Sequence, residues 1–278
     1  MTYDLLLIGD LDILRMQAAL ASVAQVPVEK VDVGSGWSGD RNWDAPVLCT
    51  YEELDGDISY SLDIHLSTVE PAVEELARHL AVELGELILY PAESNPPSAF
   101  WLVQPDGSRT RARIEDEDLD DTTLHVIDAV EKPVALLPDV KVELQPEVIW
   151  SHRMPTPITE ELERLLAADP RILTRNAALT HAMDRLGAWE ALTARMATGW
   201  PPDGWYPLEY WQDDMVMRDR LAADLEIIPQ SVVDPFTAAL ARVDEAFRAG
   251  TREISGVAGE KGWWWRRAPE PAPWSPGR

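Results

Sequence analysis

In the sequence Ile58-Ser-Tyr-Ser-Leu-Asp-Ile-His-Leu-Ser67, apolar and polar side chains alternate without interruption. Successive side chains of a β-strand point to opposite faces of a sheet, so this alternation predicts a strand with one buried face and one polar face. Sheets of this kind are typically antiparallel or mixed, and they bury their apolar face under another layer. The segment therefore predicts a layered α+β domain.

Further strands and two helices are predicted on both sides of this segment. The strands cover residues 3–9, 31–33, 46–53, 87–90, 99–103, 110–114, 124–130 and 140–144. The first helix begins after an N-cap at Asp10 or Asp12, and the second ends at Gly85. The order β-α-β-β-α-β-β-β predicts two helices over one face of a mixed or antiparallel sheet. The ferredoxin-like split βαβ is the nearest named architecture.

The second half of the chain has helical rather than strand-like periodicity. Prolines between residues 133 and 157 predict an extended connector, and helices are predicted over 159–168, 171–198, 207–225 and 235–250. We therefore expect three parts: an acidic α+β domain at 1–145, a C-terminal all-helical module at 146–252, and a Trp- and Pro-rich tail at 253–278.

An aromatic elbow, Gly199–Trp211, separates two of these helices. It contains three Trp, two Tyr, three Pro and two Gly. Aromatic side chains bury a large area, so the preferred interpretation is a structural staple between helices. Trp and Tyr also dominate binding hot spots, so the alternative is a secondary interface. The residues concerned are Trp200, Trp205, Tyr206 and Trp211.

Charge is distributed unevenly along the chain, whose formal net charge is −25. Residues 1–150 contain 30 acidic and 9 basic side chains, a net charge of −21, whereas residues 151–278 contain 19 and 15, a net charge of −4. An acidic domain repels nucleic acid and anionic membranes and attracts basic protein surfaces. Solubility alone is the alternative explanation. The one-sided distribution favours a basic protein partner.

Two segments supply most of the candidate partner-binding residues. Gly34-Ser-Gly-Trp-Ser-Gly39 fits G-x-G-x-x-G, but loop-forming residues and not a helix follow it, so it predicts a surface loop and no nucleotide site. Glu115-Asp-Glu-Asp-Leu-Asp-Asp121 lacks the glycine and glutamate of a calcium loop, so it predicts a solvated acidic loop. The predicted binding surface consists of Trp37, Asp40, Trp43, Asp44, Asp55, Asp57, Glu115, Asp116, Glu117, Asp118, Asp120 and Asp121.

The sequence contains no convincing catalytic or metal-binding motif. Asp10-Leu-Asp12 resembles the D-x-D of haloacid-dehalogenase-type phosphotransferases, but Leu14 stands where that family has Thr or Val, and helix capping explains the pair better. The five histidines lack metal-ligand spacing, and Cys49 has no basic neighbour that would activate its thiol. We predict no catalytic residues, no metal and no cofactor.

Membrane and secretion signals are missing from the sequence. No apolar run reaches the roughly 18 residues that span a bilayer, and the N-terminus has no basic segment typical of a signal peptide. The single cysteine excludes an internal disulfide. These features predict a cytoplasmic protein that contacts neither membrane nor nucleic acid, and they leave its oligomeric state open.

One stretch resembles a known family. The run Leu87-Ile-Leu-Tyr-Pro-Ala-Glu-Ser-Asn-Pro-Pro-Ser-Ala-Phe-Trp-Leu-Val-Gln-Pro-Asp-Gly107 looks like a segment of immunity proteins from bacterial polymorphic-toxin systems, in which a helix precedes a short strand, a loop and a hairpin with a Pro-Asp-Gly-type turn. The bias for Arg over Lys also resembles proteins of high-GC actinobacteria. The resemblance implies a non-catalytic protein that binds a cognate toxin and occludes its active site, and it carries over no individual site residues.

Three functional hypotheses follow. The first is a non-catalytic immunity or inhibitor protein that neutralises a basic toxin or nuclease by occluding it through an acidic surface. The second is an enzyme of unknown reaction, with carboxylates and His152 or His181 in a site between the domains. The third is a scaffold or oligomerising protein whose assembly contacts are the aromatic elbow and Trp263–Trp265.

Overall fold

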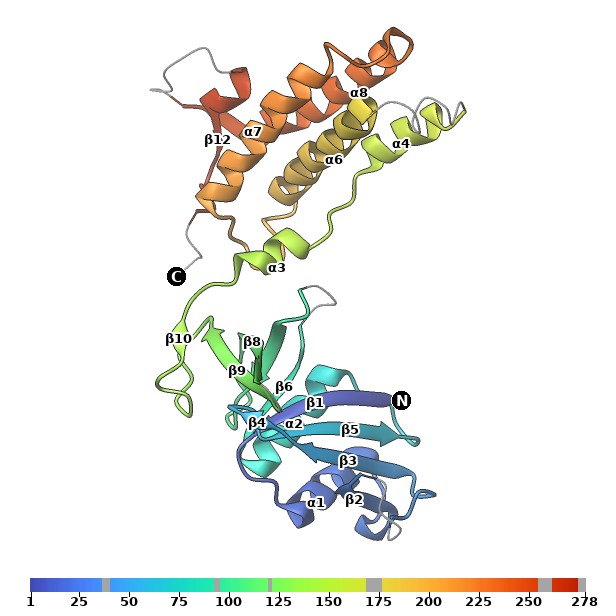
Figure 1. Cartoon of the computed structure of the whole chain (residues 1–278), viewed down its shortest axis with the longest axis vertical. Helices are drawn as coiled ribbons and strands as arrows, with labels where there is room; N and C mark the ends of the chain where they lie inside the picture. The colour runs from blue at the N-terminus through green and yellow to red at the C-terminus, as the bar shows by residue number, and fades with distance from the viewer. Residues whose placement is uncertain (37–40, 93–95, 120–121, 169–176, 255–261, 275–278) are drawn as a thin grey trace. The chain divides into compact units, whose positions relative to one another are not determined.

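A computed structural model describes residues 1–36, 41–92, 96–119, 122–168, 177–254 and 262–274 of the chain. The chain divides into two compact units, Met1–Val148 and Ile149–Arg278. The first unit contains a large mixed sheet and the second is mainly helical (Figure 1). The predicted α+β class is confirmed.

One sheet with two long helices forms the first unit. Its strands lie in the order β10-β9-β8-β7-β6-β1-β5-β3-β2, with β4 paired to β9. In chain order, the elements are β1 (Thr2–Ile8), α1 (Ile13–Ala24), the 3-10 turn η1 (Val28–Lys30), β2 (Val31–Ser35), β3 (Val47–Glu53), β4 (Asp55–Gly56), β5 (Tyr60–Leu66), α2 (Val73–Leu84), β6 (Leu87–Pro91), β7 (Ala99–Val103), β8 (Arg109–Leu119), β9 (Thr122–Val130) and β10 (Lys141–Val142).

The centre of this sheet has the predicted ferredoxin-like arrangement. Strands β6, β1, β5 and β3 are neighbours in that order, and each adjacent pair is antiparallel. Helix α1 follows β1, and α2 connects β5 to β6, which is the connectivity of a split βαβ. Both helices pack against the same apolar face of the sheet (Figure 1).

Local signals in the sequence fix the ends of these helices. The Asp12 carboxylate accepts hydrogen bonds from the backbone N–H groups of Leu14 and Arg15, at 2.9 and 3.1 Å, so Asp12 caps α1. Gly85 ends α2 in the left-handed conformation, at φ +78°, which glycine adopts without strain. Beneath the helices, Leu62 and Ile64 of β5 are fully buried, as the alternating pattern predicts.

A second core lies on the other face of the sheet. Leu87 and Leu89 of β6 belong to it, whereas Ile88 and Tyr90 of the same strand belong to the core under the helices. The short strand β4 precedes β5 in the chain but pairs with β9, so the sheet curls back on itself around the second core. Burial on both faces explains why β6 is a continuous apolar run.

The described part of the acidic run, Glu115–Leu119, is a strand and not the predicted loop. Strand β8 continues through Glu115–Asp118 to Leu119 and pairs antiparallel with β9, where Glu117 lies opposite Leu124. Acidic residues have low strand propensity, but context outweighs it here, because the ladder satisfies the backbone while the carboxylates stay exposed. The side chains are solvated as predicted, and the loop assignment is wrong.

Helices make up most of the second unit. Helix α6 packs against α4, α7 and α8 (Figure 1). The elements are α3 (Pro146–Ser151), which crosses the division between the units, α4 (Pro157–Leu166), α6 (Ala177–Ala197), α7 (Leu208–Asp224), α8 (Gln230–Ala249), β11 (Thr251–Glu253), the 3-10 turn η2 (Trp263–Arg266) and β12 (Arg267–Pro269).

Two details of this unit differ from the expected elements. Pro235 lies inside α8 and does not begin it, because Pro229 is the N-cap and the helix tolerates the single backbone hydrogen bond that a proline removes. The described part of the tail contains a strand that was not predicted, β12, which pairs with β11, and the Trp264 side chain is buried. The second unit is therefore helical with a small two-stranded sheet.

Candidate functional site

Five of the acidic residues predicted for partner binding lie on one hairpin and the short strand beside it. Glu115, Asp116, Glu117 and Asp118 lie exposed on β8, and Asp55 on β4 lies next to β9. The Thr122 hydroxyl on β9 donates to the Asp55 carboxylate at 3.1 Å. Tertiary pairing thus brings Asp55 to an acidic run some sixty positions away in the chain.

Several of these carboxylates have intramolecular partners. Asp116 lies 2.7 Å from Nδ1 of His125, and Asp118 accepts a hydrogen bond from the Thr123 hydroxyl at 2.9 Å. Asp57 accepts the backbone N–H of Ile127 at 2.9 Å. Asp57 therefore anchors the curl of the sheet, a structural role that leaves less of its carboxylate for a partner.

Trp43 lies beside a basic side chain that makes several hydrogen bonds. Its side chain is 40% exposed, and the guanidinium of Arg41 lies 4.8 Å from the ring centroid. Arg41 is paired with Asp32 and donates to the backbone oxygens of Gly34 and Cys49. These contacts hold the ring in position while one side stays open to solvent. Asp44, close by in the chain, is exposed.

Four residues of the predicted surface lie outside the described part of the chain. They are Trp37, Asp40, Asp120 and Asp121.

A further acidic group, which the sequence analysis did not select, lies on the polar face of the central strands. Asp4 on β1 pairs in register with Asp63 on β5, and Glu52 lies on the neighbouring strand β3. Together with Trp43 and His65, they line a depression of about 430 Å³. The alternation over residues 58–67 placed Asp63 and His65 on a polar face, but only the strand register shows that Asp4 adjoins them.

The aromatic elbow forms part of the core of the second unit. Trp200, Trp205, Tyr206 and Trp211 are 8, 6, 5 and 6% exposed. Trp200 packs on Tyr206 and Trp211, at centroid distances of 5.2 and 6.4 Å, and Trp211 stacks on Phe247 at 5.6 Å. Rings with so little free surface hold helices together, as the staple interpretation predicts, and offer little area to a partner.

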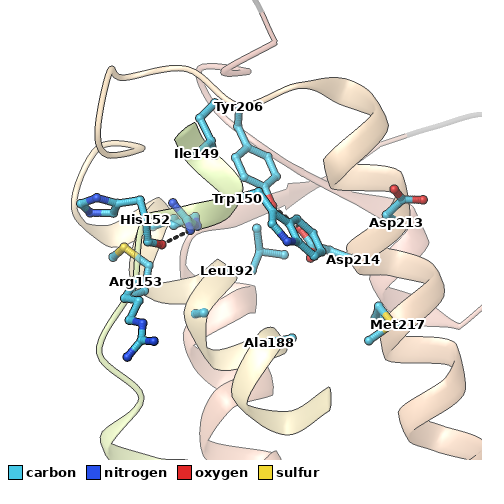
Figure 2. Close-up of a pocket in the computed structure, with 13 residues that line it drawn as sticks. Ile149, Trp150, His152, Arg153, Ala188, Leu192, Tyr206, Asp213, Asp214 and Met217 are labelled. Atoms are coloured by element: carbon cyan, nitrogen blue, oxygen red, sulfur yellow. Dashed lines mark hydrogen bonds between the residues drawn. The ribbon is translucent and has the colours of Figure 1, made fainter. Parts of the chain in front are cut away.

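A cavity of about 330 Å³ lies beside this elbow (Figure 2). Ala188 and Leu192 of α6, together with Met217 of α7, give it apolar walls. The small Ala188 side chain leaves room between the two helices. Trp150 of α3 also lines the cavity, and it remains 70% exposed although its ring packs edge-on against Tyr210 at 5.7 Å.

Two polar side chains of the cavity lining, Tyr206 and Asp214, are in direct contact. The Tyr206 hydroxyl donates a 2.8 Å hydrogen bond to the Asp214 carboxylate. Burial raises the pKa of Asp214 to about 7, against the lowering effects of the Tyr206 hydrogen bond and the charge of Arg195. Burial also raises the pKa of Tyr206, and the negative charge of Asp214 adds to this effect. Near neutral pH, the Asp214 carboxyl therefore exists in both protonation states.

These groups do not form a nucleophile–base pair of the kind that catalyses hydrolysis. Figure 2 shows the His152 ring turned away from Asp214. Burial raises the pKa of the Cys49 thiol to about 12, which makes it a poor nucleophile. His181 is exposed on α6. Within the described ranges, no group of three or more His, Cys, Asp or Glu side chains is placed to hold a metal ion.

Comparison of the chain with protein-family models, with curated proteins and with solved structures gives no match. Among the residues that the structure describes, no helix is both long and apolar enough to cross a membrane.

Proposed function

We propose that this chain is a non-catalytic binding protein of the immunity or inhibitor type, which neutralises a basic toxin or nuclease by covering it with the acidic surface of its first unit. The observation that carries the proposal is the depression on the polar face of β1, β5 and β3. There, Asp4, Glu52 and Asp63 surround an open sheet face with Trp43 at its edge.

The register of these strands favours a cationic partner. Asp4 and Asp63 are direct cross-strand neighbours, and like charges in that position repel each other. A Lys or Arg side chain between them would replace the repulsion with two attractions. Because both carboxylates are exposed in the free protein, desolvating them requires a partner that supplies compensating charge.

Trp43 supplies the apolar component of such an interface. Its ring is positioned by Arg41 and partly exposed, which suits an anchor that loses little conformational freedom on binding. The acidic β8–β9 hairpin adds a second concentration of negative charge, which would accelerate association with a basic protein at low salt.

The products of the neighbouring reading frames are the partners to test. Each would be expressed in a host, alone and together with this chain. We expect one product to be basic and toxic, and growth to be restored by co-expression. Purified complexes should weaken by at least about tenfold between low and high ionic strength, because much of the attraction is screened.

Matched charge variants locate the interface. Asp4→Asn with Asp63→Asn should weaken binding by at least about tenfold, the equivalent of one lost charged contact. Glu75→Gln with Glu83→Gln makes the same change in charge on the exposed side of α2 and should leave affinity nearly unchanged. Equal losses in both variants, or an affinity indifferent to salt, would contradict the proposal.

A further inference from the structure

The second unit contains a ligand-sized cavity that the proposed inhibitor function does not use. About 330 Å³ in volume, it has mostly apolar walls and one partly buried carboxylate, that of Asp214 (Figure 2). Clefts of this size, with apolar walls and a few converging polar groups, are typical of small-molecule sites.

The Arg195 side chain stabilises the cavity through hydrogen bonds to two backbone segments. Nη1 donates to the backbone oxygen of Pro201 at 3.1 Å, and Nη2 donates to the backbone oxygen of His152 at 2.5 Å. The side chain therefore ties the elbow to the segment after α3. Burial lowers the pKa of this guanidinium, and the electrostatic effects of Tyr206 and Asp214 partly oppose that lowering. Arg195 is thus a structural link and a poor receptor for an anionic ligand.

Two other charged residues line the cavity without pointing to its centre. Figure 2 shows the Arg153 side chain extending away from Trp150 and Asp214, and it shows the Asp213 carboxylate directed away from the cavity. Both residues are exposed. The charged group available to a ligand is therefore Asp214, which accepts a hydrogen bond from the neutral hydroxyl of Tyr206.

Aromatic side chains complete the site. Trp150 and Tyr206 line it together with Asp214. Trp150 packs on Tyr210, and Tyr210 packs on Tyr206 at a centroid distance of 6.0 Å. An indole ring next to a carboxylate suits a positively charged group, because the faces of aromatic rings carry negative potential.

We propose that this cavity binds a small organic cation, a protonated amine with an apolar body. Its ammonium group would pair with the Asp214 carboxylate beside Trp150, and its apolar body would lie against Leu192 and Met217. The inference is independent of the proposed inhibitor function, because all of these residues belong to the second unit.

Three ligands of one shape test the proposal by calorimetric titration of the full chain at about pH 8. They are n-hexylammonium, hexanol and hexanoate, six-carbon chains that end in a cationic, a neutral and an anionic group. Hexylammonium should bind at least about tenfold more tightly than hexanol, the equivalent of one charge-assisted contact, and hexanoate should bind most weakly. Tighter binding of hexanoate, or equal binding of all three, would overturn the proposal.

Variants of neighbouring aspartates locate the ammonium group. Asp214→Asn keeps the shape of the side chain and should abolish the preference for hexylammonium over hexanol. Asp213→Asn makes the same change one residue away and should leave that preference intact. Ala188→Leu fills the cavity and should weaken all three ligands. Circular dichroism of each variant distinguishes a lost site from a lost fold.

The preference of the cavity for hexylammonium over hexanol should also depend on the charge of Asp214. The groups that influence the charge of this carboxylate are Tyr206 from the elbow, Arg195 from α6 and Asp213 from its own helix. Hexylammonium should bind more tightly as pH rises through about 7, because Asp214 then loses its proton. If the affinity of Asp214→Asn for hexylammonium rises with pH to the same extent, a group other than Asp214 causes the rise, and the proposal is contradicted.

Discussion

Asp214 shows how one side chain can link stability to pH. It is partly buried between α7 and the elbow, and burial raises its pKa from the ordinary 3.8 to about 7. A carboxyl whose pKa is raised by folding binds more protons in the folded state than in the unfolded state. Folding stability must therefore fall as pH rises between these two values.

We predict that the second unit loses stability between about pH 4 and about pH 7 through this group, and that Asp214→Asn removes this loss. Other carboxylates add their own pH dependence, so the informative quantity is the difference between variant and parent. Scanning calorimetry should show that the melting temperature of the variant increases relative to that of the parent as pH rises. Asp213→Asn serves as the control, and a pH-independent difference for Asp214→Asn would show that its pKa is not raised.

Asp57 was predicted to bind a partner, but its hydrogen bonds give it a structural role in the first unit. Its carboxylate accepts the Ile127 N–H, and its own N–H donates to the backbone oxygen of His125 at 2.8 Å. Asp57→Ala should lower the free energy of unfolding of the first unit by about 1–2 kcal/mol, because the Ile127 N–H loses its partner. Asp55→Ala, two residues earlier on β4, is the control and should cost less in urea unfolding. The reverse order would contradict this assignment.

At the scale of elements, the aromatic elbow connects α6 to α7 through buried rings. Trp200 adopts a positive φ of +64°, directly after Gly199 at +80°. This backbone bend turns the Trp200 ring toward Tyr206 and Trp211, which lie later in the chain. The elbow is thus a packing element as much as a turn.

Trp200→Ala should destabilise the second unit by about 3–5 kcal/mol, the usual effect of removing a large buried aromatic side chain. Thermal unfolding followed by circular dichroism should show the helical transition moved to lower temperature while the transition of the sheet unit stays in place. Trp43→Ala, which removes a partly exposed Trp from the first unit, is the control for a large change in volume. A folded Trp200→Ala protein of unchanged stability would show that the elbow does not staple the helices.

For the whole molecule, the main feature is the difference in charge between the two units. Met1–Val148 has a net charge of −21 and Ile149–Arg278 has −4, since the two residues that distinguish this division from that at residue 150 are uncharged. A high net charge of one sign destabilises a compact state through self-repulsion.

Added salt should therefore stabilise the first unit more than the second. Raising NaCl from about 20 mM to about 500 mM shortens the Debye length from roughly 20 Å to under 5 Å and screens the repulsion. Scanning calorimetry should show the transition of the first unit moving upward by more than that of the second. Equal shifts would mean that the acidic side chains are far enough apart in the folded unit to repel little.

The sequence alone was sufficient to predict the fold class, the central strands and the two helices over one face. These features depend on side-chain periodicity and capping, which are local: the alternation at residues 58–67, the Asp12 cap and the Gly85 end. The sequence also shows directly the acidic character of the first half and the density of aromatic residues at the elbow.

Tertiary structure decided how these elements pair and which side chains meet. The strand character of Glu115–Asp118 depends on β9, and the meeting of Asp4 with Asp63 depends on the register of β1 and β5. The cavity around Asp214 requires α3, α6, α7 and the elbow together. Contacts between distant residues depend on pairing and packing of the whole chain, and a local pattern does not contain them.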